Sequence, residues 1–195
     1  MSSTKTTLRQ PRQQRSMATR EKLLDCAGQL LAEVGVDRLS TNLVAERAGV
    51  SPPTLYHYFP DKYALLRVLG ERLMAAQNAL VPLAALQDAA TIAQVLRDHV
   101  TLTRASPGGP WVMRMLRAVP QLADVRLSSH RMLAAALTRA AMAQDPAADP
   151  LALARQARLC VDLGYAAIEL ALDEPDLDEA AIMQDAARAI AAVLG

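Results

Sequence analysis

The sequence predicts an all-α protein, and two observations support that prediction. Apolar residues recur three and four positions apart in one segment after another, which gives each segment one apolar face as a helix. Glycine, proline and capping residues stand between these segments, where helices begin and end. The chain has 195 residues, of which 52% are hydrophobic and 21% charged, enough for one or two domains with a substantial core.

The first apolar pattern covers residues 19–34 and ends at Gly35. The residues on its apolar face are Leu23, Leu24, Ala27, Leu30, Leu31 and Val34. We expect this helix to be a scaffold for the short helices that follow. Cys26 lies within it, and we interpret both Cys26 and Cys160 as core thiols, because neither has a cysteine or histidine at metal-binding spacing.

Residues 40–62 contain two short helices and the start of a third. The first covers 41–48, capped by Ser40 or Thr41, and ends at Gly49, where a glycine accepts the left-handed backbone of a turn. Ser51 opens the second helix, whose first turn holds Pro52 and Pro53. Because the two prolines have no N–H, the side chain of Ser51 must cap the helix through the N–H of Thr54.

The second short helix combines an apolar side with an unusually polar surface. Leu55 and Phe59 are four residues apart and can both face inward. The remaining surface carries the hydroxyl and imidazole groups of Thr54, Tyr56, His57 and Tyr58. A polar helix this short is stable only when it docks on a larger body. A helix-turn-helix with its second helix in the major groove of DNA accounts for both features.

Residues 19–80 resemble the DNA-binding domain of the TetR family of bacterial transcriptional regulators. The resemblance rests on LLAEVGVDRLST, VAERAGVS and TLYHYF followed by Asp61-Lys62, in the family's order and spacing. Two pairs depart from the family pattern, Asn42-Leu43 and Pro52-Pro53, and both affect base recognition. The resemblance implies an N-terminal three-helix helix-turn-helix domain followed by a helical ligand-binding and dimerisation domain.

The matching positions supply the expected DNA contacts. We expect phosphate contacts from Thr41, Tyr56 and Lys62, which match the family's backbone contacts. The full set of expected DNA-binding residues is Thr41, Asn42, Ser51, Pro53, Thr54, Tyr56, His57, Tyr58 and Lys62. Two such helices, one per subunit, would enter successive major grooves of a near-palindromic operator, about 34 to 36 Å apart.

The formal net charge of +1 hides an uneven distribution. Residues 1–22 hold six basic side chains against Glu21 alone, whereas residues 63–195 are slightly acidic. We interpret residues 1–18 as a flexible basic arm that contacts DNA, and a solvated disordered tail is an equal alternative. The start of the chain has no apolar run typical of a secretory signal, so we expect a cytoplasmic protein.

The expected domains are the arm at 1–18, the helix-turn-helix domain at 19–62, a connecting helix at 63–80 and the second domain at 81–195. Asp61 should cap the connecting helix, and Lys62 in its first turn is placed for a phosphate or is a surface lysine. Thr91 and Gln94 form a capping box at the start of the next helix. SPGGP at 106–110 is the strongest break in the chain.

The second domain suggests a ligand and a partner subunit. Broad apolar bands on the last two helices indicate a four-helix homodimer interface, with burial inside one subunit as the alternative. We expect an unidentified, largely apolar small-molecule effector among residues 91–172. The candidate ligand-binding residues, which could instead be core residues, are His99, Arg104, Trp111, Arg117, His130, Asp162 and Tyr165.

Enzymatic function is not expected. The sequence has no GxGxxG, no phosphate loop and no metal-ligand spacing, and its three histidines lie on different expected helices, so no catalytic residue, metal or cofactor is assigned. The prediction is a DNA-binding regulator, a repressor because repression is what the family usually does. The rival interpretation is a helical dimeric ligand-binding or interaction protein without DNA function.

Overall fold

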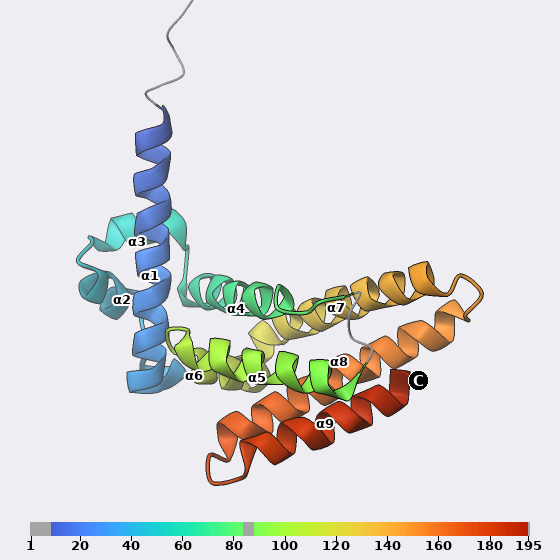
Figure 1. The fold of residues 1–195 in the computed structure, drawn as a ribbon. Coiled ribbons are helices and arrows are strands. Elements are labelled where there is room, and N and C mark those ends of the chain that lie inside the picture. Colours follow the sequence, from blue (N-terminus) through green and yellow to red (C-terminus); the bar gives the residue numbers. More distant parts are fainter. Residues whose placement is uncertain (1–8, 84–87, 195) are drawn as a thin grey trace, which may run out of the picture.

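The computed structural model describes residues 9–83 and 88–194, which form α-helices and one short 3-10 helix (Figure 1). This confirms the predicted all-α class. The elements in chain order are α1 Arg9–Arg38, α2 Thr41–Ala48, α3 Pro52–Tyr58, α4 Lys62–Asn78, α5 Ala89–Ala105, α6 Gly109–Ala118, η1 Pro120–Leu122, α7 Ala123–Gln144, α8 Pro150–Asp173 and α9 Glu179–Leu194. Within the described ranges, no helix is long and apolar enough to cross a membrane.

Helix α1 is the scaffold of the N-terminal domain. It packs on α2, α4 and α6, while α3 packs on α2. Leu23, Leu24 and Leu31 are almost fully buried on its inner face. At Gly35 the backbone leaves the helical region, with φ 74° and ψ 170°, and one further turn completes the element. The expected end at Gly35 is therefore a kink, because glycine alone adopts such a positive φ without strain.

The structure differs from the expectation of a flexible arm over residues 1–18. Helix α1 begins at Arg9, so residues 9–18 continue the scaffold helix past α3 (Figure 1). Ser16 shares a 3.1 Å hydrogen bond with the Tyr58 hydroxyl, which ties this extension to α3. Residues 1–8 of the expected arm lie outside the described residues.

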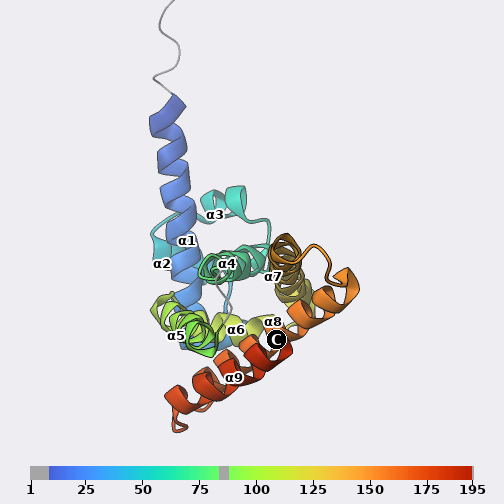
Figure 2. The same ribbon diagram turned by 45° about the vertical axis from the view of Figure 1, so that its right-hand side comes forward.

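The second domain is a stack of helices built on α4. Helix α4 packs on α7, α5 and α6, and the outer layer is formed by α8 against α7 and by α9 against both α5 and α8. Figure 2 shows α8 and α9 at the end of the molecule away from α3. Asp88, not the expected Thr91, caps α5: its Oδ1 accepts the Thr91 N–H at 2.9 Å, and Gln94 donates to Asp98 instead.

The loop between α5 and α6 touches α1 backbone to backbone. A Cβ atom on Gly28 would lie 2.1 Å from the carbonyl oxygen of Pro107, and one on Gly108 would lie 2.0 Å from that of Gly28. Gly108 also has a φ of 66°. No larger residue fits at either position without moving a backbone, so SPGGP serves as a close contact between the two domains.

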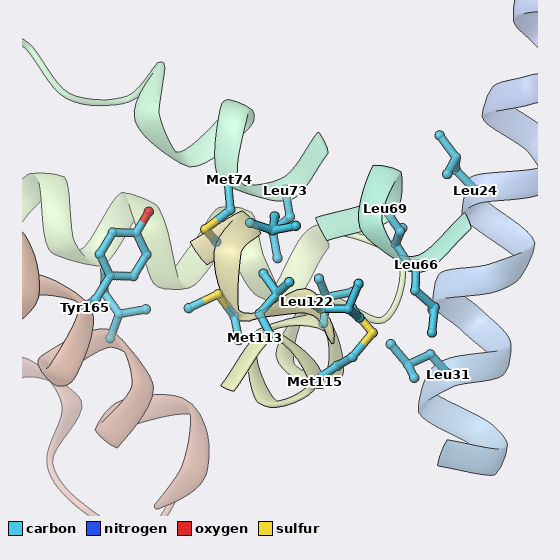
Figure 3. Close-up of a cluster of buried hydrophobic side chains, with 14 of the residues drawn as sticks. Leu24, Leu31, Leu66, Leu69, Leu73, Met74, Met113, Met115, Leu122 and Tyr165 are labelled. Carbon is cyan, nitrogen blue, oxygen red and sulfur yellow. The ribbon is translucent and has the colours of Figure 1, made fainter. Parts of the chain in front are cut away.

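One core runs through both domains. Figure 3 shows buried side chains leading from Leu24 on α1, through Leu69 and Met74 on α4 and Met113 on α6, toward Tyr165 on α8. Protein interiors are packed as densely as organic crystals, so a displacement at one end of such a core is felt by its neighbours. Helix α4 therefore links α1 of the N-terminal domain to the helices of the second domain.

Candidate functional site

The turn between α2 and α3 is fixed by local hydrogen bonds. The Ser40 hydroxyl caps α2 by accepting the Leu43 N–H at 3.2 Å. Gly49 has a φ of 66°, and the Val50 N–H returns to the Ala45 carbonyl at 3.0 Å. This pattern of a left-handed glycine followed by a backward hydrogen bond ends a helix abruptly. The chain consequently reverses within three residues and sets α3 at a fixed angle to α2.

Helix α3 is held from its inner side and capped at its start. Leu55 and Phe59 are 0% and 2% exposed, so the two predicted anchors are both buried. The Ser51 hydroxyl accepts the Thr54 N–H at 3.4 Å, as the absence of N–H groups on the two prolines requires. Pro52 is the first helical residue. The short helix α3 is therefore capped by Ser51 at its start and held to the domain by the buried side chains of Leu55 and Phe59.

The outward face of α2 and α3 is polar. Asn42, Pro53 and His57 are exposed, and Tyr56 is 48% exposed. The Tyr56 hydroxyl shares a 3.0 Å hydrogen bond with the Thr41 hydroxyl, which brings two groups from different helices together at the surface. A helix presenting such groups on a rigid base has the form of a major-groove reader.

The charged groups beside this face have partners of their own. Lys62 Nζ donates to the Val36 carbonyl at 3.1 Å, so one of its three N–H donors holds α4 to the end of α1. Arg47 forms a two-pronged pair with Glu33, at 2.8 and 2.7 Å. Its hydrogen bonds keep the pKa of the Glu33 carboxyl below the usual value. Arg47 therefore stabilises the α1–α2 contact.

A cavity lies in the second domain. Its volume is about 80 Å³, and its wall comes from α5, α7, α8 and α9 together with Val81. Among its lining residues are Ile92, Leu96, Val161 and Ile168, which are all apolar. Ligand pockets in proteins are commonly apolar with a few placed polar groups, and this cavity has that character.

Two aromatic rings and a buried amide join the cavity to α4. Tyr165 and His99 both line the cavity and meet edge to face, with ring centroids 6.3 Å apart. The Tyr165 hydroxyl donates to Gln77 Oε1 at 3.2 Å, and Gln77 Nε2 donates to Thr103 Oγ1 at 2.7 Å. Gln77 is 0% exposed on α4. A displacement of the Tyr165 ring would therefore strain the hydrogen bond between Tyr165 and Gln77 on α4.

His130 and Asp162 form a second polar contact behind Tyr165. His130 Nδ1 donates to Asp162 Oδ1 at 2.8 Å, and Arg158 donates to the same oxygen at 2.6 Å. The His130 ring stacks on Tyr165 with centroids 4.1 Å apart. Burial lowers the pKa of His130, against the opposing effect of Asp162, so the ring is neutral at pH 7. Its Nε2 is buried and has no hydrogen-bond partner.

The family model described as "Bacterial regulatory proteins, tetR family" matches residues 23–69, the part of the chain that contains the helix-turn-helix. The tetracycline repressor protein class A from transposon 1721 of Escherichia coli is 51% identical over 49 residues, which are 25% of this chain and 23% of the repressor. Over residues 23–69 the chain is thus similar to the TetR family of regulators. The match to this repressor spans about a quarter of the repressor's length.

Two solved structures show the same fold over most of the chain. A TetR-family transcriptional regulator from Streptomyces coelicolor has a TM-score of 0.69 at 22% identity and covers 91% of this chain and 81% of its own. Salmonella enterica GusR has a TM-score of 0.71 at 20% identity, and the match covers 91% of this chain and 96% of GusR. The second domain thus shares an architecture with these proteins at low sequence identity.

The structure collects most of the predicted DNA-binding residues on one surface. Thr41, Asn42, Pro53, Tyr56 and His57 lie on the outward side of α2 and α3. The others are engaged with protein atoms: Ser51 and Thr54 share a 2.9 Å hydrogen bond, Tyr58 bonds Ser16, and Lys62 bonds Val36.

The predicted ligand-binding residues separate into two groups. His99 and Tyr165 line the cavity, and His130 and Asp162 lie behind them. The remaining three lie elsewhere: Arg104 pairs with Glu179, Trp111 is 42% exposed beneath Arg114, and Arg117 pairs with Glu169 and Asp173. Arg104 and Arg117 stabilise contacts between helices, Trp111 contacts a residue of its own helix, and none of the three lines the cavity.

Two residues of this region are not predicted from the sequence as parts of a site. Gln77 is not singled out, and Cys160 is predicted only as a core thiol. Gln77 follows Leu73 by four residues on the buried face of α4, so a polar residue within an apolar strip was the available signal. Cys160 lines the cavity. Burial raises the pKa of its thiol to about 11, which keeps it protonated and unreactive at neutral pH. Among the described residues, no group of histidine, cysteine and acidic side chains could hold a metal ion.

Proposed function

We propose that this chain is a TetR-family transcriptional repressor that binds a near-palindromic DNA site as a homodimer and leaves it when a small molecule occupies the cavity. The observation that supports it best is the outward polar face of α2 and α3, anchored by Leu55 and Phe59. A rigid helix of this kind presents side chains to base edges, and neighbouring hydroxyls set its register on the phosphates.

Each part of this face has a distinct expected role. The paired hydroxyls of Thr41 and Tyr56 are placed for phosphate oxygens, since their mutual hydrogen bond orders both before DNA arrives. Asn42 and His57 are the exposed groups with the donors and acceptors that read base edges. Pro53 offers apolar contact, such as to a thymine methyl group.

A strip on α8 supports the homodimer. Leu159 and Leu170 are 48% and 41% exposed, Ala166 is exposed, and Leu163 is half-buried. These four residues follow one another at spacings of four, three and four, so they lie on one face of the helix. A contiguous apolar strip on a helix that packs beside α9 suits a four-helix interface between two subunits.

The regulatory step follows from α4. An effector that favours one position of Tyr165 would shift α4 through Gln77, and only three residues separate α4 from the end of α3. A ligand shifts such an equilibrium only by its difference in affinity for the two positions. The two copies of α3 would then no longer match half-sites about 34 to 36 Å apart.

Selection of DNA from a random pool tests the whole proposal. We expect an enriched, near-palindromic sequence with half-sites centred about one helical turn apart. Failure to enrich any sequence would support the rival function, a helical dimeric ligand-binding or interaction protein. A reporter gene placed behind the selected site then gives the sign of regulation, and we expect lower expression when the protein is present.

Two tyrosines provide a matched pair for the phosphate contact. Tyr56→Phe removes the hydroxyl that meets Thr41, so we expect binding about two- to tenfold weaker on every DNA sequence. Tyr63→Phe is the control, because Tyr63 is similarly exposed but lies on α4. Fluorescence anisotropy on the selected DNA measures both. Equal affinity of the two variants would remove Tyr56 from the interface.

Two leucines of α8 test the dimer in the same way. Leu159→Glu places a charge at the first position of the apolar strip, and we expect monomers by analytical ultracentrifugation with the helical content retained. Leu151→Glu is the control, since Leu151 is 78% exposed at the start of the same helix. A dimer that survives the first substitution would place the interface elsewhere.

A further inference from the structure

The wall of the cavity offers no partner to a charged group buried in it. Its side chains come from four helices and from Val81 in the loop after α4, and most are aliphatic, as in Ile92, Leu133, Val161 and Ile190. Among the described residues of this wall, none is an aspartate, glutamate, lysine or arginine. Burying a charge without a partner is very costly, and the opposite charge that would offset this cost is not present in the wall.

Two of the polar groups at the wall already have partners. The Tyr165 hydroxyl donates its proton to Gln77 Oε1 at 3.2 Å. The Cys160 thiol lies 3.9 Å from the Ile190 carbonyl oxygen, to which it donates. Neither proton is therefore free for a ligand, and the aromatic face of Tyr165 acts as apolar surface.

His99 leaves one nitrogen available. Its Nδ1 lies 2.7 Å from the Val95 carbonyl oxygen, and because a carbonyl only accepts, Nδ1 carries the proton. Burial lowers the pKa of His99, so the ring is neutral and Nε2 holds a lone pair. Among residues 9–83 and 88–194, no donor meets Nε2. A neutral histidine in this tautomer offers the cavity a single hydrogen-bond acceptor.

We infer that the cavity takes an uncharged, mainly apolar molecule that donates one O–H or N–H hydrogen bond to His99 Nε2. A water molecule is a poor occupant, since it needs two to four polar partners and the wall offers one. An alcohol, a phenol or an amide satisfies both the acceptor and the apolar wall. That this molecule is the regulatory effector rests on the proposed function, whereas its chemistry rests on the cavity.

The size of the cavity limits the occupant. An apolar cavity of about 150 Å³ holds benzene, and this cavity measures about 80 Å³. Even a single ring therefore needs the wall to yield, for example by a turn of Tyr165, and no occupant larger than one substituted ring is expected. Phenol and toluene are suitable probes because they have nearly the same shape and differ in the hydrogen-bond donor.

The isoleucines allow the test to be read at the cavity itself. The chain has four, of which Ile92, Ile168 and Ile190 line the cavity while Ile182 does not. With the isoleucine methyl groups labelled for NMR, a ligand in the cavity moves the first three signals and leaves the fourth. Phenol, toluene, benzoate and benzylammonium are titrated separately into the full-length protein.

We expect phenol to bind about two- to tenfold more tightly than toluene, the gain of one hydrogen bond, and both charged probes to leave the three signals in place. His99→Phe keeps an aromatic ring without the acceptor, and there phenol and toluene should bind equally. Three results in the unsubstituted protein would overturn the inference: equal affinities for phenol and toluene, tighter binding of a charged probe, or no binding of any probe in the cavity. These results decide the inference even if His99→Phe does not fold.

DNA binding by the ligand-free protein separates this inference from the proposed function. A protein that prefers phenol but binds no DNA would retain the cavity chemistry and lose its role as a repressor. A protein that binds the selected DNA but shows no preference for phenol would retain the repressor and lose the ligand class assigned through His99.

Discussion

Two glycine-to-alanine substitutions test whether the contact between the domains is set by backbone. Gly28 and Gly70 both lie inside helices, so alanine brings each about 1 kcal/mol of helix propensity. At Gly28 the new Cβ would lie 2.1 Å from the Pro107 carbonyl oxygen, which belongs to the backbone. At Gly70 it would lie 2.8 Å from Leu116 Cδ2, the far end of a flexible side chain.

The magnitudes follow from what each neighbour can do. Overpacking costs about 1 to 3 kcal/mol, and a backbone that must move lies at the upper end, so Gly28→Ala should lose about 1 to 2 kcal/mol net. Leu116 can change rotamer, so Gly70→Ala should range from neutral to about 1 kcal/mol more stable. A difference near 2 kcal/mol corresponds to about 4 to 8 °C in Tm for a chain of this length.

Thermal unfolding followed by circular dichroism, at one protein concentration because association shifts Tm, measures the difference. Similar Tm values for the two variants would mean that the α5–α6 loop yields as easily as a side chain. The interpretation of Gly28, Gly108 and the SPGGP segment as a close contact between the domains would then be wrong.

Three other perturbations have defined outcomes. Tyr165→Phe leaves the buried Gln77 oxygen without its donor and should cost about 1 to 3 kcal/mol of unfolding free energy in urea titrations; an unchanged midpoint would contradict the hydrogen bond. Burial lowers the pKa of His99 and His130, so the free energy of unfolding should be full above pH 6.5 and fall below it, because the unfolded chain then binds more protons. Urea titrations from pH 7.5 to 5 should show this fall, and it should be shallower in His99→Phe. A free energy of unfolding that does not change with pH would refute the prediction. Lys62→Ala should weaken operator binding on all sequences and lower the salt slope by about one, and an unchanged slope would leave Lys62 with its bond to Val36 only.

The local features of the helix-turn-helix could be predicted from sequence because their causes lie within a few residues. Ser40, Gly49 and Ser51 act through their own backbone neighbours, and the spacing of Leu55 and Phe59 decides which side is buried. The cap of α5 was placed three residues late, since Asp88 and Thr91 are both good caps and bond each other. The hydrogen bond between Ser16 and Tyr58, which ties the helical arm to α3, joins residues 42 positions apart and has no local sequence signal.

The cavity was less predictable because its residues come from distant parts of the chain. His99 and Tyr165 were included as polar or aromatic residues on apolar faces, and so were Arg104 and Arg117. What separates the two pairs is the presence of carboxylates such as Glu179 and Glu169 opposite the arginines, which depends on how α8 and α9 pack. Hydrophobic periodicity identifies a buried face but not the helix that covers it.

The burial of both native thiols makes the protein suited to site-directed labelling. Cys26 and Cys160 are 8% and 6% exposed, and burial raises the pKa of both, so little of either is the reactive thiolate at neutral pH. A cysteine introduced at the exposed Glu46 on α2 would be modified selectively without removing them. In a dimer it would give one spin label or fluorophore on the helix-turn-helix of each subunit. The distance between the two labels could then be followed directly as phenol or DNA is added.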